Sequence, residues 1–208
     1  MKLAAIISGG KDSWYAYYKM LKKGYEITTI VTFIPKKEDS YMFHHPLANK
    51  VSLQVEKMDI SHYGFGVSGE KEKEVEEMKN HLKKIVQKEK IEGLISGAIK
   101  SNYQKSRIDK ICKELKIKSF TPLWHREEEG LLREIADSGF EFLVTQVCAE
   151  GIEEWENKII NSKNLEEFIK DLKKVKCNIS GEGGEYETFV IRSPMFVISK
   201  KLINSLFT

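Results

Sequence analysis

Cysteine is scarce in this 208-residue sequence, and its three copies are not paired. Cys112, Cys148 and Cys177 lie far apart, and no Cys-x-x-Cys motif is present that would suggest a zinc ribbon, an iron–sulfur cluster or a redox couple. We therefore expect each cysteine to be a small buried hydrophobic residue without a metal-binding or nucleophilic role.

Long apolar runs are also absent. No stretch approaches the roughly 20 apolar residues that a helix needs to cross a membrane, and Gly9 interrupts the first apolar run before a signal sequence could be complete. The sequence therefore predicts no membrane association and a cytoplasmic location.

Neither sign of charge is in large excess. The 34 lysine and arginine residues against 31 aspartate and glutamate residues leave a net charge of +3, and lysines are interleaved with glutamates along the predicted helices. Such mixing is typical of solvated helix faces and forms no basic stripe, so we expect no stable nucleic-acid partner.

What the sequence does contain is a regular alternation of strand-like and helical patterns. The strand-like runs are Leu3 to Ile7, Ile27 to Phe33, Gly93 to Ile99, Ser119 to Leu123 and Phe140 to Cys148. The helical patterns between them are Trp14 to Lys23, Glu70 to Lys90, Gln104 to Leu115 and Leu131 to Asp137. This alternation predicts an α/β fold with a doubly wound, mainly parallel five-stranded sheet covered by helices on both faces.

The pattern changes after Ala149. A charged helical segment, Leu165 to Lys174, leads to the glycine-rich stretch Gly181 to Gly184 and then to an apolar run from Thr188 to Ile198. We therefore expect a larger N-terminal domain over residues 1–150 and a smaller C-terminal lobe over residues 151–208. A second substrate would be expected in the cleft between them.

The string Ser-Gly-Gly-Lys-Asp-Ser at residues 8–13 follows the first predicted strand and opens the first predicted helix. A loop in this place presents backbone N–H groups and the positive end of the helix dipole to an anion. The two glycines allow close approach of a polyphosphate, Lys11 adds positive charge, and Asp12 can hold a magnesium ion that bridges the phosphates. The alternative is a plain tight turn with Asp12 as the helix N-cap; the strand–loop–helix context favours phosphate.

This string resembles the loop of the PP-loop ATP pyrophosphatases, whose fold is of the adenine nucleotide alpha hydrolase type. In that group a substrate oxygen attacks the α-phosphate of ATP, an adenylate forms, and pyrophosphate leaves. The resemblance implies catalytic roles for Lys11 and Asp12 and a magnesium ligand in Asp12. It implies pyrophosphate contacts for the following residues: Ser8, Gly9, Gly10, Lys11 and Ser13.

Four further strings resemble one branch of that group, the diphthine–ammonia ligases, which complete the diphthamide side chain on elongation factor 2. They are residues 40–46 (Ser-Tyr-Met-Phe-His-His-Pro), 68–72 (Ser-Gly-Glu-Lys-Glu), 96–107 (Ser-Gly-Ala-Ile-Lys-Ser-Asn-Tyr-Gln-Lys-Ser-Arg) and 181–188 (Gly-Glu-Gly-Gly-Glu-Tyr-Glu-Thr). The resemblance runs in the same order to about Pro194. It implies ATP and Mg²⁺, a protein substrate in elongation factor 2 bearing diphthine, and free ammonium, and it leaves a homodimer open.

The third string supplies candidates at the end of a predicted strand and the start of the next helix. Small residues at Ser96, Gly97 and Ala98 would admit a nucleotide bound at the first loop. Gln104 and Arg107 lie three apart on the predicted helix, where Arg107 could hold a phosphate or carboxylate bidentately. The alternative for Arg107 is a surface ion pair.

The remaining candidates come from the other strings and from the second predicted strand. Tyr103 is assigned to the substrate, and Thr32 and His44 are assigned to the nucleotide; an ordinary loop histidine is the alternative for His44. Glycines at 183 and 184 would permit close backbone approach, and the carboxylates around them could bind a cationic group or accept a proton. An acidic loop without function is the alternative. The candidate substrate contacts in this string are Glu182, Gly183, Gly184, Glu185, Tyr186 and Glu187, with Glu185 and Glu187 also as catalytic carboxylates and Tyr186 as a cation–π surface.

Two other functions fit the first loop. One is a tRNA-modifying enzyme of the same loop class, although thiolation branches usually carry cysteine pairs or a cluster. The other is a non-catalytic ATP-binding regulator on the same fold, because a fold does not fix a function.

Overall fold

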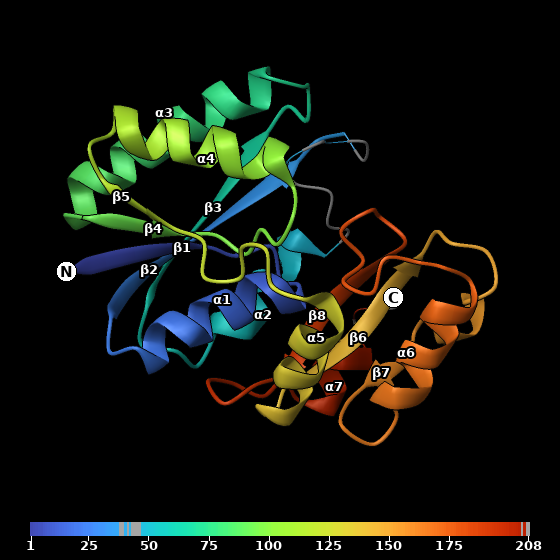
Figure 1. The fold of residues 1–208 in the computed structure, drawn as a ribbon. Helices are drawn as coiled ribbons and strands as arrows, with labels where there is room; N and C mark the ends of the chain where they lie inside the picture. Colours follow the sequence, from blue (N-terminus) through green and yellow to red (C-terminus); the bar gives the residue numbers. More distant parts are fainter. Residues whose placement is uncertain (38–39, 41, 43–46, 205, 207–208) are drawn as a thin grey trace.

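The computed structural model describes residues 1–37, 40, 42, 47–204 and 206. Five parallel strands form the larger sheet, in the order β3-β2-β1-β4-β5 (Figure 1). The strands are β1 (Lys2–Ile6), β2 (Glu26–Pro35), β3 (Ser61–Val67), β4 (Gly93–Ile95) and β5 (Lys118–Phe120). The prediction of a mainly parallel five-stranded sheet is confirmed.

Helices cover both faces of this sheet. α1 (Lys11–Lys22) and the short α2 (Val51–Val55), which follows a 3-10 turn at Ala48–Lys50, lie on one face, and α3 (Lys73–Glu89) and α4 (Asn102–Glu114) lie on the other (Figure 1). Apolar side chains of α3 and α4, among them Met78, Leu82 and Ile111, bury one face of β1, β2 and β4. The fold is therefore doubly wound, as the alternation of patterns predicts.

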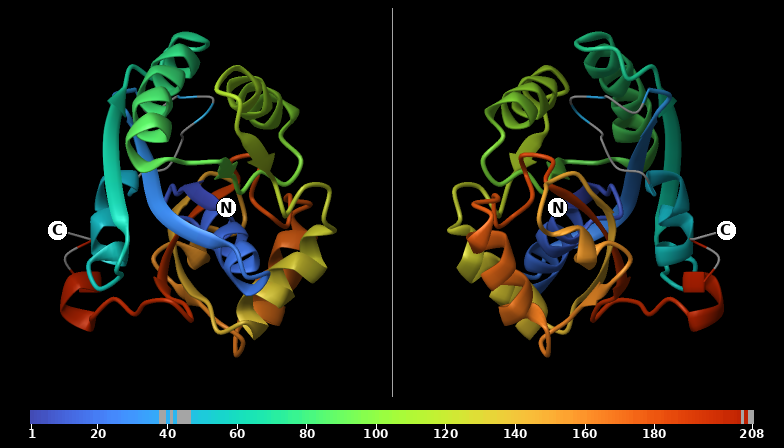
Figure 2. Two further views of the ribbon diagram at one scale, coloured as in Figure 1. Left: turned by 90° about the vertical axis from the view of Figure 1, so that its left-hand side faces the viewer. Right: turned by 90° about the vertical axis from the view of Figure 1, so that its right-hand side faces the viewer.

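A second, smaller sheet is antiparallel, in the order β7-β6-β8. Its strands are β6 (Glu141–Val147), β7 (Ile159–Ile160) and β8 (Tyr186–Arg192), and a 3-10 turn at Glu153–Trp155 lies between β6 and β7. The helices α5 (Glu128–Asp137), α6 (Leu165–Lys174) and α7 (Lys200–Asn204) belong to this part of the chain, which lies across the larger sheet from α3 and α4 (Figure 2).

The membership of the two sheets corrects one expectation. The run Phe140 to Cys148, expected as the fifth strand of the parallel sheet, forms β6, the middle strand of the antiparallel sheet. Its place in the parallel sheet is taken by β3, which pairs with β2 over seven residues. Strand propensity does not predict β3, because Gly64 and Gly66 lie in its interior and glycine is unfavourable there.

One hydrophobic core joins the two parts of the chain. Leu3 of β1 and Trp14 of α1 belong to the same buried cluster as Phe142 of β6, Phe168 of α6 and Phe189 of β8. The larger sheet ends at Phe120 and the smaller one begins at Glu141. The division into a nucleotide-binding domain over residues 1–150 and a substrate-binding lobe over residues 151–208 stays a prediction.

The cysteines differ in burial. Cys112 is buried, and burial raises the pKa of its thiol to about 11, so it behaves as an inert core residue. Cys148 is exposed, which shows that the expectation of burial is wrong for this residue. Among the described residues, no helix is both long and apolar enough to span a membrane.

Candidate functional site

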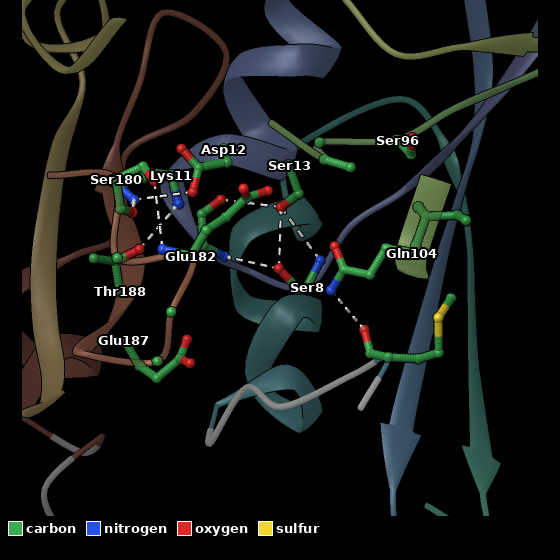
Figure 3. A pocket seen from close by; sticks show the side chains of 18 of the residues that line it. Ser8, Lys11, Asp12, Ser13, Ser96, Gln104, Ser180, Glu182, Glu187 and Thr188 are labelled. Atoms are coloured by element: carbon green, nitrogen blue, oxygen red, sulfur yellow. Dashed lines mark hydrogen bonds and ion pairs between the residues drawn. The ribbon is translucent and has the colours of Figure 1, made fainter. Parts of the chain in front are cut away.

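A pocket lies where the order of the parallel strands changes direction. From β1 the chain continues to β2 and β3 on one side and then crosses to β4 on the other side of β1, so the loops after β1 and β4 diverge. Open α/β sheets bind ligands at such a switch point. Here a cavity of about 340 Å³ is lined by residues of both loops and by the glycine-rich segment before β8 (Figure 3).

The loop after β1 has the backbone that an anion-binding turn requires. Gly9 has a φ of +96°, which favours glycine, and Gly10 is the N-cap of α1 without a side-chain cap. Asp12 is therefore not the N-cap. Gly10, Lys11, Asp12 and Ser13 line the pocket. Gly9 does not; it packs behind the loop, where a Cβ would lie 2.9 Å from the Phe189 ring.

Two serines hold this loop together. The Ser13 hydroxyl donates to the Gly10 carbonyl at 3.0 Å and lies 3.3 Å from the Ser8 hydroxyl. The Ser8 backbone N–H donates to the Ser13 hydroxyl at 3.3 Å. Both side chains line the pocket (Figure 3), so the same hydroxyls that brace the loop are available to a bound phosphate.

Lys11 is a buried cation at the meeting point of the two parts of the chain. Its side chain is 3% exposed, and Nζ donates to Asp12 at 2.9 Å and to the Ser180 carbonyl at 2.6 Å. Burial alone would lower the pKa of Lys11, but the Asp12 carboxylate, the Tyr186 ring and Glu187 outweigh it and raise the pKa above its usual value. Lys11 is therefore charged at neutral pH.

Asp12 has an oxygen suited to a cation. Oδ2 accepts from Lys11, whereas Oδ1 is buried and has no hydrogen-bond partner among the described residues. The described residues contain no group of three histidine, cysteine, aspartate or glutamate side chains that could hold a metal ion alone. Magnesium is commonly held by one or two carboxylates together with substrate phosphates, so Asp12 fits an ion that arrives with a nucleotide.

The loop after β4 forms the second wall. Ser96, Gly97 and Ala98 all line the pocket, and their contact with a nucleotide stays a prediction. A Cβ on Gly97 would lie 2.7 Å from the backbone nitrogen of Ser13, so only glycine lets the two loops approach this closely.

Part of the pocket lining is apolar. Ile6, Met42 and Ile108 line it together with Gln104, whose Nε2 donates to the Met42 carbonyl at 3.3 Å. The sequence does not predict that Ile6 and Ile108 line the site. They belong to ordinary apolar patterns of a strand and a helix, which indicate burial and nothing more.

The glycine-rich segment closes the pocket from the second sheet. Glu182, Gly183, Gly184, Tyr186 and Glu187 line it. The Glu182 carboxylate accepts from the backbone N–H groups of Ile99 and Lys100, each at 2.6 Å. Burial raises the pKa of Glu182. Through these two hydrogen bonds, Glu182 connects the glycine-rich segment to the loop after β4.

Tyr186 and its two neighbours in the chain, Glu185 and Glu187, differ in their surroundings. Tyr186 is 2% exposed, its hydroxyl donates to the Ile179 carbonyl, and the Lys11 ammonium lies 5.2 Å from its ring centroid. The predicted cation–π face is thus already in contact with a cation of the chain. Glu187 is 8% exposed and faces the cavity. Glu185 does not line it; Oε1 accepts from the Asn178 backbone N–H at 3.1 Å, and Oε2 is buried without a partner among the described residues.

Besides Gly9 and Glu185, three further predicted contacts do not line this pocket. Tyr103 and Arg107 line a separate, open depression of about 610 Å³ beside α4. Arg107 pairs with Glu72, and its Cζ lies 3.7 Å from the Tyr103 ring centroid, so the alternative of a surface ion pair describes its present contacts. Thr32 is 1% exposed and lies 3.0 Å from His62 Nε2. His44 lies outside the described residues.

Family models and individual known proteins match this chain along most of its length, and both point to the same family. Residues 1–119 match the family model described as the diphthamide synthase N-terminal domain, and residues 127–204 match the diphthamide synthase C-terminal domain. The mouse and human diphthine–ammonia ligases are each 32% identical to it over 222 residues, which covers 98% of this chain and 82% of each relative.

More distant similarities extend to a fungus and an archaeon. The diphthine–ammonia ligase of Schizosaccharomyces pombe is 28% identical over 94% of this chain and 35% of its own length. A solved structure described as a predicted subunit of tRNA methyltransferase from Methanocaldococcus jannaschii covers 93% of this chain and 98% of its own, at 17% identity and a TM-score of 0.44. That TM-score is too low to bear on fold or function.

Proposed function

The chain belongs to the diphthamide synthase family, and from this premise we propose that its pocket uses ATP to convert diphthine and ammonia into diphthamide. The enzyme is a ligase of the diphthine–ammonia class. Its protein substrate is elongation factor 2 bearing diphthine, and its place of action is the cytoplasm.

One observation carries the proposal. A buried, charged Lys11 and the unpartnered oxygen of Asp12 lie at the start of α1, and Glu187 faces the same cavity from β8. The start of a helix with a buried cation is suited to the phosphates of a nucleotide, and a carboxylate across the cavity is suited to an amine. Both halves of an amide-forming reaction therefore find partners in one pocket.

The reaction has two steps. The diphthine carboxylate attacks the α-phosphorus of ATP, and pyrophosphate leaves with the electron pair of the broken bond. Glu187 takes a proton from ammonium, the ammonia attacks the acyl carbon, and AMP leaves. Forming a mixed anhydride first replaces one difficult substitution with two easier ones.

The residues of the first loop act on the charge that develops at phosphorus. Lys11, the backbone N–H groups at the start of α1 and the hydroxyls of Ser8 and Ser13 stabilise it by preorganised contacts. Asp12 would hold Mg²⁺, which neutralises charge on the phosphates when it is bound. Ser96, Gly97 and Ala98 leave room for the nucleotide beside them.

The direct test incubates the protein with ATP, ammonium and elongation factor 2 bearing diphthine. We expect AMP and pyrophosphate, and a modified peptide whose mass falls by the difference between a hydroxyl and an amino group. ADP and phosphate as products would contradict the adenylation step. AMP release that needs no protein substrate would contradict the assignment of elongation factor 2 as the substrate. An absence of turnover would favour the alternative of a non-catalytic ATP-binding regulator.

Substitution of the loop residues tests the roles assigned to them. We predict that Lys11→Ala and Asp12→Ala each lower AMP formation by about a hundredfold or more, the effect typical of removing a preorganised charge-stabilising group. A quenched-flow assay of pyrophosphate release measures this. Glu92→Gln, which removes an exposed carboxylate at the far end of β4, is the matched control and should turn over at the wild-type rate.

A further inference from the structure

A buried glutamine contacts the phosphate loop from behind. Gln54, on the short helix α2, is 1% exposed. Its Nε2 donates to the Gly9 carbonyl at 3.0 Å and to the Val190 carbonyl of β8 at 2.7 Å, and its Oε1 accepts from Trp14 Nε1 at 2.8 Å. One side chain thus joins the loop, the first helix and the second sheet.

Only a carboxamide satisfies these three partners. The two carbonyls can only accept and the indole N–H can only donate, which fixes the orientation of the Gln54 amide. A glutamate here would place a carboxylate against two carbonyl oxygens, and an apolar side chain would leave the indole N–H without its acceptor. Buried polar groups that lose a partner are costly, so position 54 is tightly restricted in chemistry.

The contact with Gly9 has a consequence on the other side of the loop. In a trans peptide the C=O and the following N–H point in opposite directions. The Gly9 carbonyl is held by Gln54 and by the Val190 backbone N–H, the latter at 2.9 Å. The N–H of Gly10 is thereby turned toward Ser8 and the pocket, where its hydrogen bond to the Ser8 hydroxyl is long, at 3.4 Å.

We propose that Gln54 is a positioning residue that aims the Gly10 N–H at the phosphates of the nucleotide, through its hold on the Gly9 carbonyl. A Cβ at Gly9 would lie 2.9 Å from the Phe189 ring and 3.4 Å from Val51, so these side chains lie close behind the loop at the residue that Gln54 holds. The role rests on the proposed function, in that the ligand it orients for is the pyrophosphate portion of ATP.

The experiment compares Gln54→Met with Val55→Ala in the chain of residues 1–208. Methionine keeps the length of the side chain and removes all three hydrogen bonds. Val55 is also buried on α2, and its apolar side chain forms no hydrogen bonds. Dissociation constants are measured by calorimetry for ATP and, separately, for inorganic pyrophosphate. Thermal unfolding of each variant reports the loss of stability.

We expect Gln54→Met to raise the dissociation constants for ATP and for pyrophosphate by the same factor, about tenfold. This is the effect of losing one hydrogen bond to the ligand. Val55→Ala should lower the unfolding temperature and leave both dissociation constants at the wild-type value. A third variant, Trp14→Phe, removes the indole donor and part of a buried ring but keeps both hydrogen bonds from Gln54 to the carbonyls. It should bind pyrophosphate like the wild type if the hydrogen bond to the Gly9 carbonyl is what positions the loop.

Two results would overturn the inference. If Gln54→Met binds pyrophosphate as tightly as the wild type, or if Val55→Ala weakens it equally at the same loss of stability, Gln54 has only a structural role. A wild-type chain that binds neither ATP nor pyrophosphate would instead contradict the proposed function itself. If Gln54→Met does not fold, Trp14→Phe and Gln54→Glu are compared, and equal affinities for pyrophosphate in these two variants would also reject the role.

Discussion

Glu185 and Glu187 are two residues apart and have different surroundings. Glu187 faces the cavity at 8% exposure, whereas the Glu185 side chain turns back to the backbone of Asn178. The sequence pattern offers both as catalytic carboxylates. The geometry favours Glu187 as the group that meets ammonium and favours Glu185 as a brace of the glycine-rich segment.

This difference gives a prediction about single substitutions. Glu187→Gln should lower amide formation by about a hundredfold, the usual contribution of a positioned base, while ATP still binds. Glu185→Gln, which differs by the same atom, should retain most of the turnover. Single-turnover assays with the diphthine-bearing substrate measure both. Equal losses in the two variants would show that the exposure of the carboxylate to the cavity is not what matters.

The predicted site residues that the structure brings together are mostly those in the loops after strands. Residues 8–13 and 96–98 converge because the carboxyl ends of neighbouring parallel strands meet at one edge of the sheet. Arg107 could not be placed in this way. An α-helix turns by about 100° per residue, so Gln104 and Ile108 face the pocket while Arg107, beside Ile108, turns to the outer depression.

Gly97 is a point of close approach between the loop after β4 and the start of α1. We predict that Gly97→Ala raises the KM for ATP by about tenfold or more and destabilises the fold by about 1–3 kcal/mol, because the added methyl group would meet the Ser13 backbone. Steady-state kinetics and urea unfolding measure the two effects. Gly66→Ala in β3 is the control, since a Cβ there meets nothing within 4 Å. Similar kinetics for both variants would contradict the prediction.

Glu128, the first residue of α5, ties that helix to two loops around the pocket. It accepts from Lys100 Nζ and, at 3.0 Å, from the Ser180 backbone N–H. Burial would raise the pKa of this carboxyl, but the Lys100 ammonium and the Ser180 N–H outweigh it and lower the pKa below its ordinary value of 4.5. Its contribution to stability is therefore complete above about pH 4.5 and is lost as the pH falls through the folded-state pKa.

The corresponding prediction concerns Glu128→Gln. At pH 7 the variant should be less stable than the wild type by about 1 kcal/mol, allowing for solvent screening of the pair. Urea unfolding at pH 7 and at pH 3 should show this difference shrinking at the lower pH, where the wild-type carboxylate is itself becoming protonated. A difference that stays constant over this range would show that the charge of Glu128 contributes nothing.

The elements themselves were predictable to the extent that their patterns are strong. α6 has the predicted bounds, Leu165–Lys174, because its apolar residues recur at helical spacing. β3 was missed because its two glycines suppress the strand signal. The sheet to which β6 belongs could not be predicted, because a run of buried residues such as Phe142, Leu143 and Val144 fits the middle of either sheet.

At the scale of the whole molecule, the shared core predicts a single unfolding transition. Trp14 of α1 and Trp155 of the second part are buried in one cluster, so loss of either part exposes the other. In variants that keep only Trp14 or only Trp155, with the other tryptophans replaced by phenylalanine, fluorescence and circular dichroism should give the same urea midpoint. Two separate midpoints would show that the parts unfold independently.

The hold of β8 on the first loop matters for how a working enzyme arises during translation. Residues 8–13 leave the ribosome well before β8, but the Gly9 carbonyl accepts from the Val190 N–H, and the Lys11 N–H donates to the Thr188 hydroxyl. Domains fold as their parts emerge, from the N-terminal end onward. The nascent chain therefore completes its nucleotide-handling turn only after β8 has been synthesised, and a polypeptide that terminates before β8 lacks both of these contacts.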